Sequence, residues 1–186
     1  MKDSPTLSKK LSELTFLDVF QRLDRPALES LWNRGRARNA LESIVKDTSA
    51  EPRAGFLAAE ILFQKVPGYP PETLRARLAE IYAAALANDY TVMANPWGLP
   101  GLPDGETAQH AVQIGETAVP ALRRLLEDRR VVYYSGSKEA TFGNRYRYRV
   151  KDLAAGLLAR IRNLPFQPDE DPELRDQAIE RLASML

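Results

Sequence analysis

The chain has 186 residues, a length that suits one domain with a sizeable hydrophobic core. Its 26 basic and 25 acidic residues leave a formal net charge of +1, which disfavours binding to nucleic acid or membrane through bulk charge. Hydrophobic residues make up 44% of the chain, which argues against disorder over most of its length. Cysteine is absent, which excludes a disulfide framework, a cysteine nucleophile and thiolate-held zinc.

The N-terminal segment is polar, and its first ten residues contain no apolar core of a signal peptide. No window of the chain approaches the roughly 18 apolar residues of a membrane span. We therefore expect a polar, loosely ordered segment over residues 1–15 and a single helical domain over residues 16–186. The expected protein is soluble and cytoplasmic, or periplasmic if a leader precedes Met1.

Apolar residues recur at helical spacing along most of the chain and predict an all-α fold with about seven helices. Proline and N-cap residues at the helix starts, and glycine or aspartate at the ends, divide the pattern into separate elements. The expected helices lie near residues 16–35 (in two pieces divided at Asp24), 40–47, 49–62, 72–88, 107–128 (with a break at Gly115), 150–161 and 173–186.

Two long segments interrupt the helical pattern. Residues 89–105 contain three prolines and three glycines, which forbid a regular helix, and their large apolar side chains indicate a loop pinned to the body. Residues 131–149 form the second segment, which we expect to be irregular or to contain a small β-hairpin. Arginine and tyrosine alternate strictly from Arg145 to Arg149, as in a short strand.

The chain contains an internal repeat, which is a primary signal of fold. Ala40-Leu41-x-x-Ile44-Val45-x-Asp47 matches Ala121-Leu122-x-x-Leu125-Leu126-x-Asp128, and Arg53 to Ala59 matches Arg149 to Ala155. The second copy has about fifteen extra residues between its aspartate and its arginine. We expect Asp47 and Asp128 to accept backbone N–H groups where the next helix starts. Arg53 and Arg149 would reach that aspartate, or the aspartate of a neighbouring repeat.

The second copy resembles the HEAT-repeat family in its short bacterial form. Pro120 inside the first helix, followed by Asp128 in the turn, is typical of that family, whereas the first copy has Asn39 in place of the proline. The sequences around Asn95-Pro-Trp97-Gly98 and from Tyr134 to Asp152 are similar to a group of uncharacterised bacterial HEAT-like proteins. The resemblance implies a HEAT-like α-solenoid and no particular activity. An irregular helical bundle is the alternative.

The candidate binding residues lie in the two irregular segments, because long loops on a rigid scaffold often carry binding. They are Asn95, Trp97, Tyr133, Tyr134, Glu139, Tyr146 and Arg149. The alternative is that the second segment folds back and caps a groove with its own aromatic rings. Trp97 is either an interface anchor, as tryptophan often is at binding hot spots, or the plug that pins its loop.

The sequence offers little for catalysis. His110 is the single histidine, nothing at metal-ligand spacing surrounds it, and no serine occurs in a nucleophile-elbow context. Glu139 and Asp152 could form an acid–base pair, although Asp152 near Arg149 is more simply a capping or seam ion pair. We therefore expect no catalytic residue, no metal and no cofactor.

These observations predict a non-catalytic protein–protein interaction module, such as an adaptor, inhibitor or assembly factor. Its groove would be bordered by residues 89–105 and 131–149. One alternative is a small-molecule enzyme or lyase-like chaperone that uses the same groove. The third is a nucleic-acid binder, with stacking from tyrosine and phosphate contacts from arginine. The sequence identifies neither the protein partner nor the oligomeric state.

Overall fold

The computed structural model describes residues 3–21, 26–32, 37–91, 95–136 and 138–186, and these segments are mostly helical. Within the described segments, β-type pairing consists of two isolated antiparallel bridges, Leu99 with Leu102 and Val131 with Arg149. The all-α class predicted from the apolar spacing is confirmed. The α-helices are α1 (Asp3–Ser12), α2 (Pro26–Trp32), α3 (Ala37–Lys46), α4 (Pro52–Lys65), α5 (Glu72–Ala87), α6 (Glu106–Ile114), α7 (Val119–Arg123), α8 (Lys138–Tyr146), α9 (Val150–Arg162) and α10 (Pro172–Met185).

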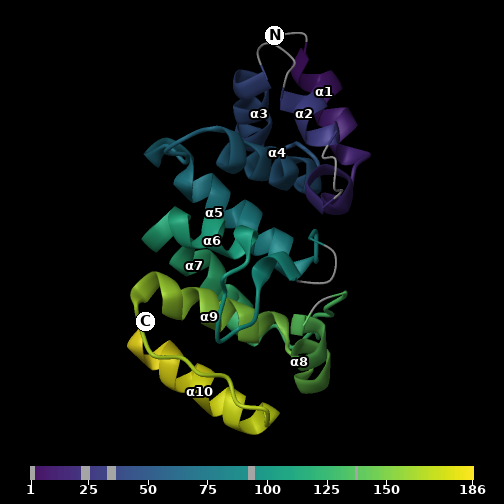
Figure 1. Ribbon diagram of the computed structural model, residues 1–186. Helices are drawn as coiled ribbons and strands as arrows, with labels where there is room; N and C mark the ends of the chain where they lie inside the picture. The colour runs from purple at the N-terminus through teal and green to yellow at the C-terminus, as the bar shows by residue number, and fades with distance from the viewer. Residues whose placement is uncertain (1–2, 22–25, 33–36, 92–94, 137) are drawn as a thin grey trace.

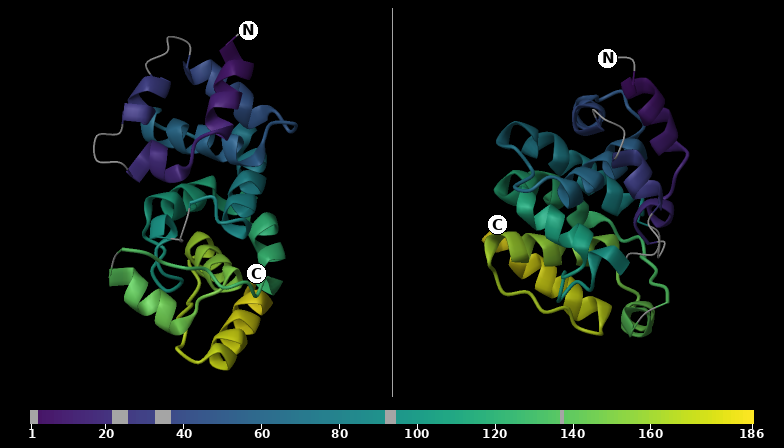
Figure 2. Two further views of the ribbon diagram at one scale, coloured as in Figure 1. Left: turned by 90° about the vertical axis from the view of Figure 1, so that its right-hand side faces the viewer. Right: turned by 45° about the horizontal axis from the view of Figure 1, so that its top comes forward.

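The helices follow one another along the long axis of the molecule. Figure 1 shows α1 to α4 at one end, α5, α6 and α7 in the middle, and α9 and α10 at the other end. Figure 2 shows the same order from two further sides. The buried apolar residues form one continuous cluster from Leu7 in α1 to Leu182 in α10, so a single core joins the whole stack.

Helix α4 is the central element of the N-terminal half. Pro52 occupies its first turn, and the Glu51 carboxylate accepts the Ala54 backbone N–H at 2.8 Å, which caps the helix start. Every residue from Ala54 to Leu62 is buried because α1, α3 and α5 pack around the helix. A helix buried on all sides accommodates an ionised side chain only if that side chain is paired.

Helix α9 has the same position in the C-terminal half. Its N-terminus is capped by the Asp152 carboxylate, which accepts the Arg149 backbone N–H at 2.8 Å. Its C-terminus is Asn163, whose backbone is left-handed with a φ of 51°. All residues from Val150 to Ala159 are buried. Because helix α9 is buried on all sides, the surrounding helices and the two irregular segments all pack against it.

The N-terminal segment differs from its expected loose state. It forms α1, in which Leu7 and Leu11 are buried against α3 and α4. Two leucines four residues apart lie on one face of a helix, and this pair is enough to anchor a short polar helix on a large apolar surface. The segment is part of the core.

The prediction of an extended Arg145–Arg149 stretch is wrong for its first half, because α8 continues to Tyr146. Arg147 then adopts a φ of 51°, which turns the chain and brings Val132 and Tyr148 into a single backbone hydrogen bond of 2.8 Å. Arginine and tyrosine alternate here because successive residues contact different partners, and not because they lie on the two faces of a strand.

The two copies of the repeat are both pairs of packed helices. Helix α3 packs on α4, and α7 with the 3₁₀ turn Arg124–Glu127 packs on α9. Asp47 Oδ1 accepts the backbone N–H of Ser49 at 2.8 Å, and Asp128 Oδ1 accepts that of Arg130 at 3.0 Å. Both aspartates therefore close the turn two residues later, and neither caps the helix that follows.

The repeat arginines have different partners. Arg53 donates to the Ser12 carbonyl at 2.8 Å and does not reach Asp47, so that prediction is wrong. The reason is that α1 leaves its C-terminal carbonyls beside α4, while Asp47 already binds Ser49. Arg149 bonds to Asp176 of α10 at 2.6 Å, and α10 belongs to neither copy of the repeat.

None of the helices in the described segments is both long enough and apolar enough to cross a membrane.

Candidate functional site

The two irregular segments are joined to each other. The Asn95 side chain donates to the Ser135 carbonyl at 2.7 Å and accepts the Ser135 backbone N–H at 2.9 Å. The Tyr134 hydroxyl donates to the Gly98 carbonyl at 3.0 Å. The expected open groove with these loops as its two borders is therefore absent at the place where they meet, because residues 95–98 and 134–135 are in direct contact.

Tyr134 and Trp97 are buried side chains that hold the loops in place. Tyr134 is 3% exposed, and its backbone exchanges two hydrogen bonds with the Asn144 side chain. Trp97 is 1% exposed and meets the Tyr82 ring edge-on, with 6.2 Å between ring centroids. Of the two interpretations of each residue, the contacts support the structural one, a loop that is pinned by its own aromatic side chain.

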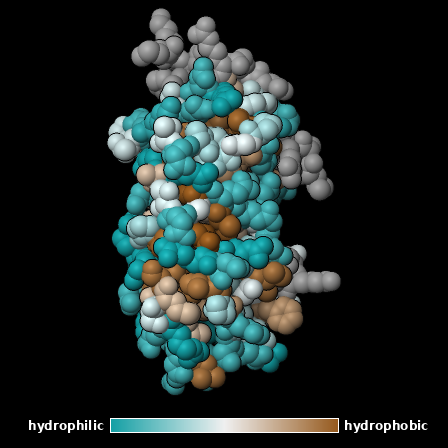
Figure 3. All heavy atoms as spheres, turned by 90° about the vertical axis from the view of Figure 1, so that its left-hand side faces the viewer, coloured by the Kyte–Doolittle hydropathy of each residue, from teal (hydrophilic) through white to brown (hydrophobic). Residues whose placement is uncertain are grey.

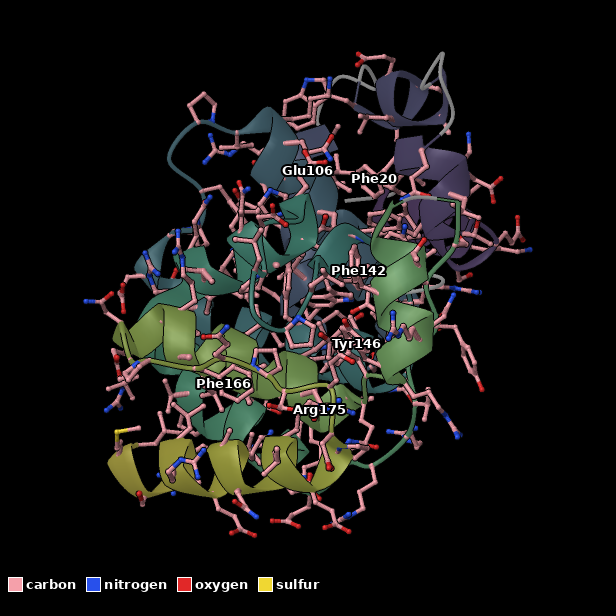
Figure 4. All side chains as sticks on the ribbon, turned by 60° about the horizontal axis from the view of Figure 1, so that its bottom comes forward. Phe20, Glu106, Phe142, Tyr146, Phe166 and Arg175 are labelled. Carbon is pink, nitrogen blue, oxygen red and sulfur yellow. The ribbon has the colours of Figure 1, made fainter. Side chains whose placement is uncertain are left out.

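The other predicted residues of the second irregular segment, residues 131–149, which is called the insert from here on, are dispersed. Tyr133 is 64% exposed, while Tyr146 is half-buried and donates to Glu170 of the segment before α10. Figure 4 shows Tyr146 beside α8, with Arg175 close to it between α9 and α10. The side chain of Glu139 lies outside the described residues, so the predicted acid–base pairing with Asp152 is not addressed. The predicted set does not converge on one cavity.

Arg149 and Asp152 belong to a buried charge network that attaches α10. The Asp152 carboxylate is fully buried, binds the Arg149 guanidinium at 2.9 Å and lies 3.3 Å from Arg175 Nε. Asp176 accepts from Arg149 at 2.6 Å and pairs with Lys151 at 3.2 Å. Burial would raise the pKa of Asp176, but the hydrogen bonds from Arg149 and Lys151 outweigh it and hold that pKa below its ordinary value. These are the contacts of a structural ion pair.

A second buried polar group centres on Glu60 of α4, a residue that the sequence reasoning missed. Tyr82 and Thr107 donate to its carboxylate, the latter at 3.1 Å, and His110 Nδ1 lies 3.0 Å from it. Burial, followed by the charge of Glu60, raises the pKa of Tyr82 well above its ordinary value. A glutamate within the otherwise apolar stretch Phe56–Leu62 was the available signal, since a buried charge needs partners.

A cavity lies on the other side of the first loop, residues 89–105. It has a volume of about 470 Å³, is open to solvent, and is lined by residues 100–104, one face of α6, the C-terminal half of α9 and the chain that follows α9. Its lining residues are Pro100, Gly101, Leu102, Pro103, Asp104, Gln109, Val112, Gln113, Gly156, Ala159, Arg160, Asn163, Leu164 and Phe166. The lining is mixed, with apolar side chains between amides, one carboxylate and one guanidinium.

A second cavity of about 380 Å³ continues the first toward the insert. The two share Gly101, Leu102 and Phe166, and the second also reaches Tyr148. The two cavities lie along the boundary between residues 99–104 and residues 164–168, named here the loop–linker groove. The two segments touch within it, since a Cβ atom on Gly101 would lie 2.9 Å from Pro168 Cδ. Figure 4 shows Phe166 over α9, on the linker side of this groove.

Close backbone contacts hold the loop side of the groove in place. A Cβ atom on Gly156 would lie 2.1 Å from the Pro100 carbonyl oxygen, so only glycine allows α9 to approach the loop at this point. Leu99 and Leu102 exchange two backbone hydrogen bonds of 3.2 and 2.9 Å, which close the loop tip. The Leu102 side chain projects from this tip with 60% of its surface exposed.

Figure 3 shows one side of the molecule, on which hydrophobic surface gathers at mid-height between hydrophilic areas. The most exposed large apolar side chains include Leu102 and Tyr133 on the loops and Leu174 on α10. Among the described residues, no group of three or more histidine, aspartate or glutamate side chains is arranged to hold a metal ion.

Comparison with known proteins adds no relative: no family model, no curated protein and no solved structure matches this chain. The candidate site is therefore defined by the physical chemistry of its own residues.

Proposed function

We propose that this protein is a non-catalytic protein–protein interaction module that binds a segment of its partner in the loop–linker groove. The observation that carries the proposal is the position of Leu102. A large apolar side chain, 60% exposed, stands on a closed loop tip between two adjoining cavities. Apolar anchors on preformed rims are typical of binding surfaces, because little conformational entropy is lost when a partner covers them.

The helix stack is, in the same proposal, a HEAT-like solenoid. The support comes from the two matched pairs, α3 with α4 and α7 with α9, and from the equivalent turn bonds of Asp47 and Asp128. In such a solenoid the second helix of each pair faces the binding groove. Helix α9 is a second helix, and Gly156, Ala159 and Arg160 contribute to the cavity lining.

Binding is favoured over catalysis by the location of the acid–base groups. Glu60 and His110 are buried and line neither cavity. Among the described residues, Asp104 is the one carboxylate in the lining, and no histidine, serine, threonine or second carboxylate lines either cavity. An enzyme or a lyase-like chaperone in this groove would need acid–base groups that face the cavity.

Nucleic-acid binding is the weaker alternative because four of the five arginines between Arg129 and Arg149, all except Arg147, are paired with carboxylates in the described segments. Arg145 lies 3.8 Å from Glu170, and both Arg129 and Arg149 bind Asp176 at 3.1 and 2.6 Å. Guanidinium groups that are neutralised in this way supply little attraction for phosphates.

The test compares two exposed leucines. Leu102→Asp places a charge at the centre of the groove, whereas Leu174→Asp places the same charge on α10, where Leu174 is 45% exposed. Both variants should keep the helical circular-dichroism spectrum of the wild type. Proteins that co-purify with the wild type and with Leu174→Asp but not with Leu102→Asp would support the proposal. Identical partner sets for both variants would reject the groove as the binding site.

A further inference from the structure

Residues 164–168, named here the strap, connect α9 to α10 along the loop–linker groove. They lie outside any helix and contain two prolines, Pro165 and Pro168. Proline fixes φ and lacks an N–H group, so both residues keep the chain extended and out of regular hydrogen bonding. The strap is therefore a stiff, extended segment laid over the body of the protein.

The hydrogen bonds that fix the strap lie at its two ends. At the α9 end, the Leu164 N–H donates to the Ala159 carbonyl at 2.9 Å. Just beyond the other end, the buried Arg175 guanidinium donates to the backbone carbonyls of residues 169–170 at 2.8 and 2.9 Å. Within the described part of the chain, residues 165–168 form no hydrogen bond of their own. The middle of the strap can therefore leave the body without breaking an intramolecular hydrogen bond.

Phe166 is the residue that holds the middle of the strap in place. Its side chain is half-buried against the core and lines both cavities, at the point where they adjoin. Figure 4 shows it over α9. Two residues further on, Pro168 meets Gly101 of the first loop. The strap thus fills the middle of the groove, and it does so through van der Waals contacts alone.

The same contacts show which kind of segment fits between the first loop and α9. An aromatic ring between two prolines lines the same two cavities as Leu102, the exposed residue on which the proposed function depends. A partner segment of this chemistry would take the same place, and the two segments cannot be there together. A segment of the same chain competes at an effective concentration in the millimolar range, so it keeps weak ligands out of the groove.

We infer that the strap is an autoinhibitory segment of the loop–linker groove. Phe166 occupies the place of an aromatic side chain from an extended, proline-containing segment of the partner protein. When that segment binds, residues 165–168 are displaced as a unit, while Leu164 and the Arg175 contacts still fix the two ends. This inference rests on the proposed function, to which it adds the chemistry of the partner and a competitor that the partner must displace.

The probe for the first test is a synthetic peptide with the sequence of residues 163–171 and blocked ends. In the full chain, Phe166→Ser removes the internal ring and should raise the affinity for this peptide at least about tenfold over the wild type, because a competitor that fills the groove in about nine-tenths of the molecules or more is lost. Phe142→Ser makes the same change on α8, where Phe142 is 48% exposed, and should leave the affinity unchanged. A peptide with serine in place of its phenylalanine should not bind. Isothermal titration calorimetry measures each dissociation constant.

A disulfide across the groove provides an independent test, since the chain contains no cysteine of its own. The contact between Gly101 and Pro168 brings these positions within reach of such a bond in the double variant Gly101→Cys/Pro168→Cys. In the oxidised protein the strap cannot leave, and the peptide should bind at least about tenfold more weakly than to the same protein after reduction. Comparing the two redox states of one variant removes the effect of the substitutions themselves.

The outcomes also separate this inference from the proposed function. Equal affinities of the wild type and Phe166→Ser, or of the oxidised and reduced double variant, would overturn the inference, as would a lack of peptide binding to Phe166→Ser. If one of these results is found while Leu102→Asp still loses the co-purifying proteins, the groove stands as the partner site and the strap is only one of its walls. If Leu102→Asp keeps those proteins, the groove is not the partner site, and both proposals fail.

Discussion

The Asn95 side chain and the Ser135 backbone exchange two hydrogen bonds, of 2.7 and 2.9 Å, across 40 residues of sequence. This reciprocal pair, together with the Tyr134 hydroxyl on the Gly98 carbonyl, makes one structural unit of two loops that the sequence separates. The insert therefore holds in place the loop that forms one side of the groove. Substitutions in the insert should therefore alter the shape of the groove, although few insert residues line it.

Replacing Asn95 with alanine should detach the insert from the first loop. We expect a loss of about 1–2 kcal/mol in the free energy of unfolding, the usual contribution of two partly exposed hydrogen bonds. The Ser135 amide should also exchange its hydrogen faster, which exchange measured by mass spectrometry would detect. Asn39→Ala, on the exposed face of α3, is the control and should leave both quantities unchanged. Unaltered protection of Ser135 in the Asn95 variant would contradict the proposed coupling.

Adding a methyl group at Gly156 should displace the loop. Its Cβ atom would lie 2.1 Å from the Pro100 carbonyl oxygen, and relief of this overlap should cost about 2–4 kcal/mol in urea denaturation. Gly55→Ala is a matched control inside another buried helix, where the new atom would meet Ile81 at an ordinary 3.7 Å. Because alanine favours a helix over glycine, the control should be neutral or stabilising by up to about 1 kcal/mol. Equal destabilisation by the two substitutions would be evidence against the close approach.

Glu60 should be one of the most sensitive positions in the chain. Glu60→Ala removes an acceptor from three buried groups, Tyr82, Thr107 and His110, and should cost about 3–5 kcal/mol.

Tyr82→Phe removes a single donor of that group and should cost about 1 kcal/mol. The surface control is Glu80→Ala on α5, whose pairing with Arg124 is exposed and should contribute at most about 1 kcal/mol. These three values can be compared from thermal and urea unfolding at neutral pH. Similar losses of stability in Glu60→Ala and Glu80→Ala would show that the buried hydrogen bonds of Glu60 contribute no more than an exposed ion pair.

The stability of the α10 attachment should depend on pH through Asp176. Its hydrogen bonds to Arg149 and Lys151 hold its pKa in the folded protein below the ordinary value, so the unfolded chain binds a proton more readily than the folded one. The corresponding stabilisation is fully present above the unfolded pKa of about 3.9 and is lost as pH falls through the lower folded pKa.

Asp176→Asn should therefore cost about 1–3 kcal/mol at pH 7, and its difference from the wild type should shrink as pH falls below about 4. Urea midpoints at pH 7, 5 and 3 measure this, with Glu180→Gln on the same helix as a control. A difference that stays constant over this range would show that the charge of Asp176 is not its source.

Local patterns in the sequence were enough to predict the class of fold and the positions of several elements. The spacing of apolar residues predicted a helix over 72–88, and α5 spans Glu72–Ala87. Gly115 was predicted as a break and has a φ of 77° between α6 and the next turn. The repeat also located two pairs of packed helices. These features depend on residues within one or two helical turns of each other, so a single sequence contains them.

What only the tertiary structure decided is which side chains meet. The sequence left two interpretations open for Trp97 and Tyr134, a binding residue or a plug, and burial at 1% and 3% exposure favours the second. Glu60 acquires its partners from residues 22, 47 and 50 positions away, and the loop–linker groove combines α6, α9 and two connecting segments. No local pattern encodes such contacts, because they depend on how already formed helices pack against one another.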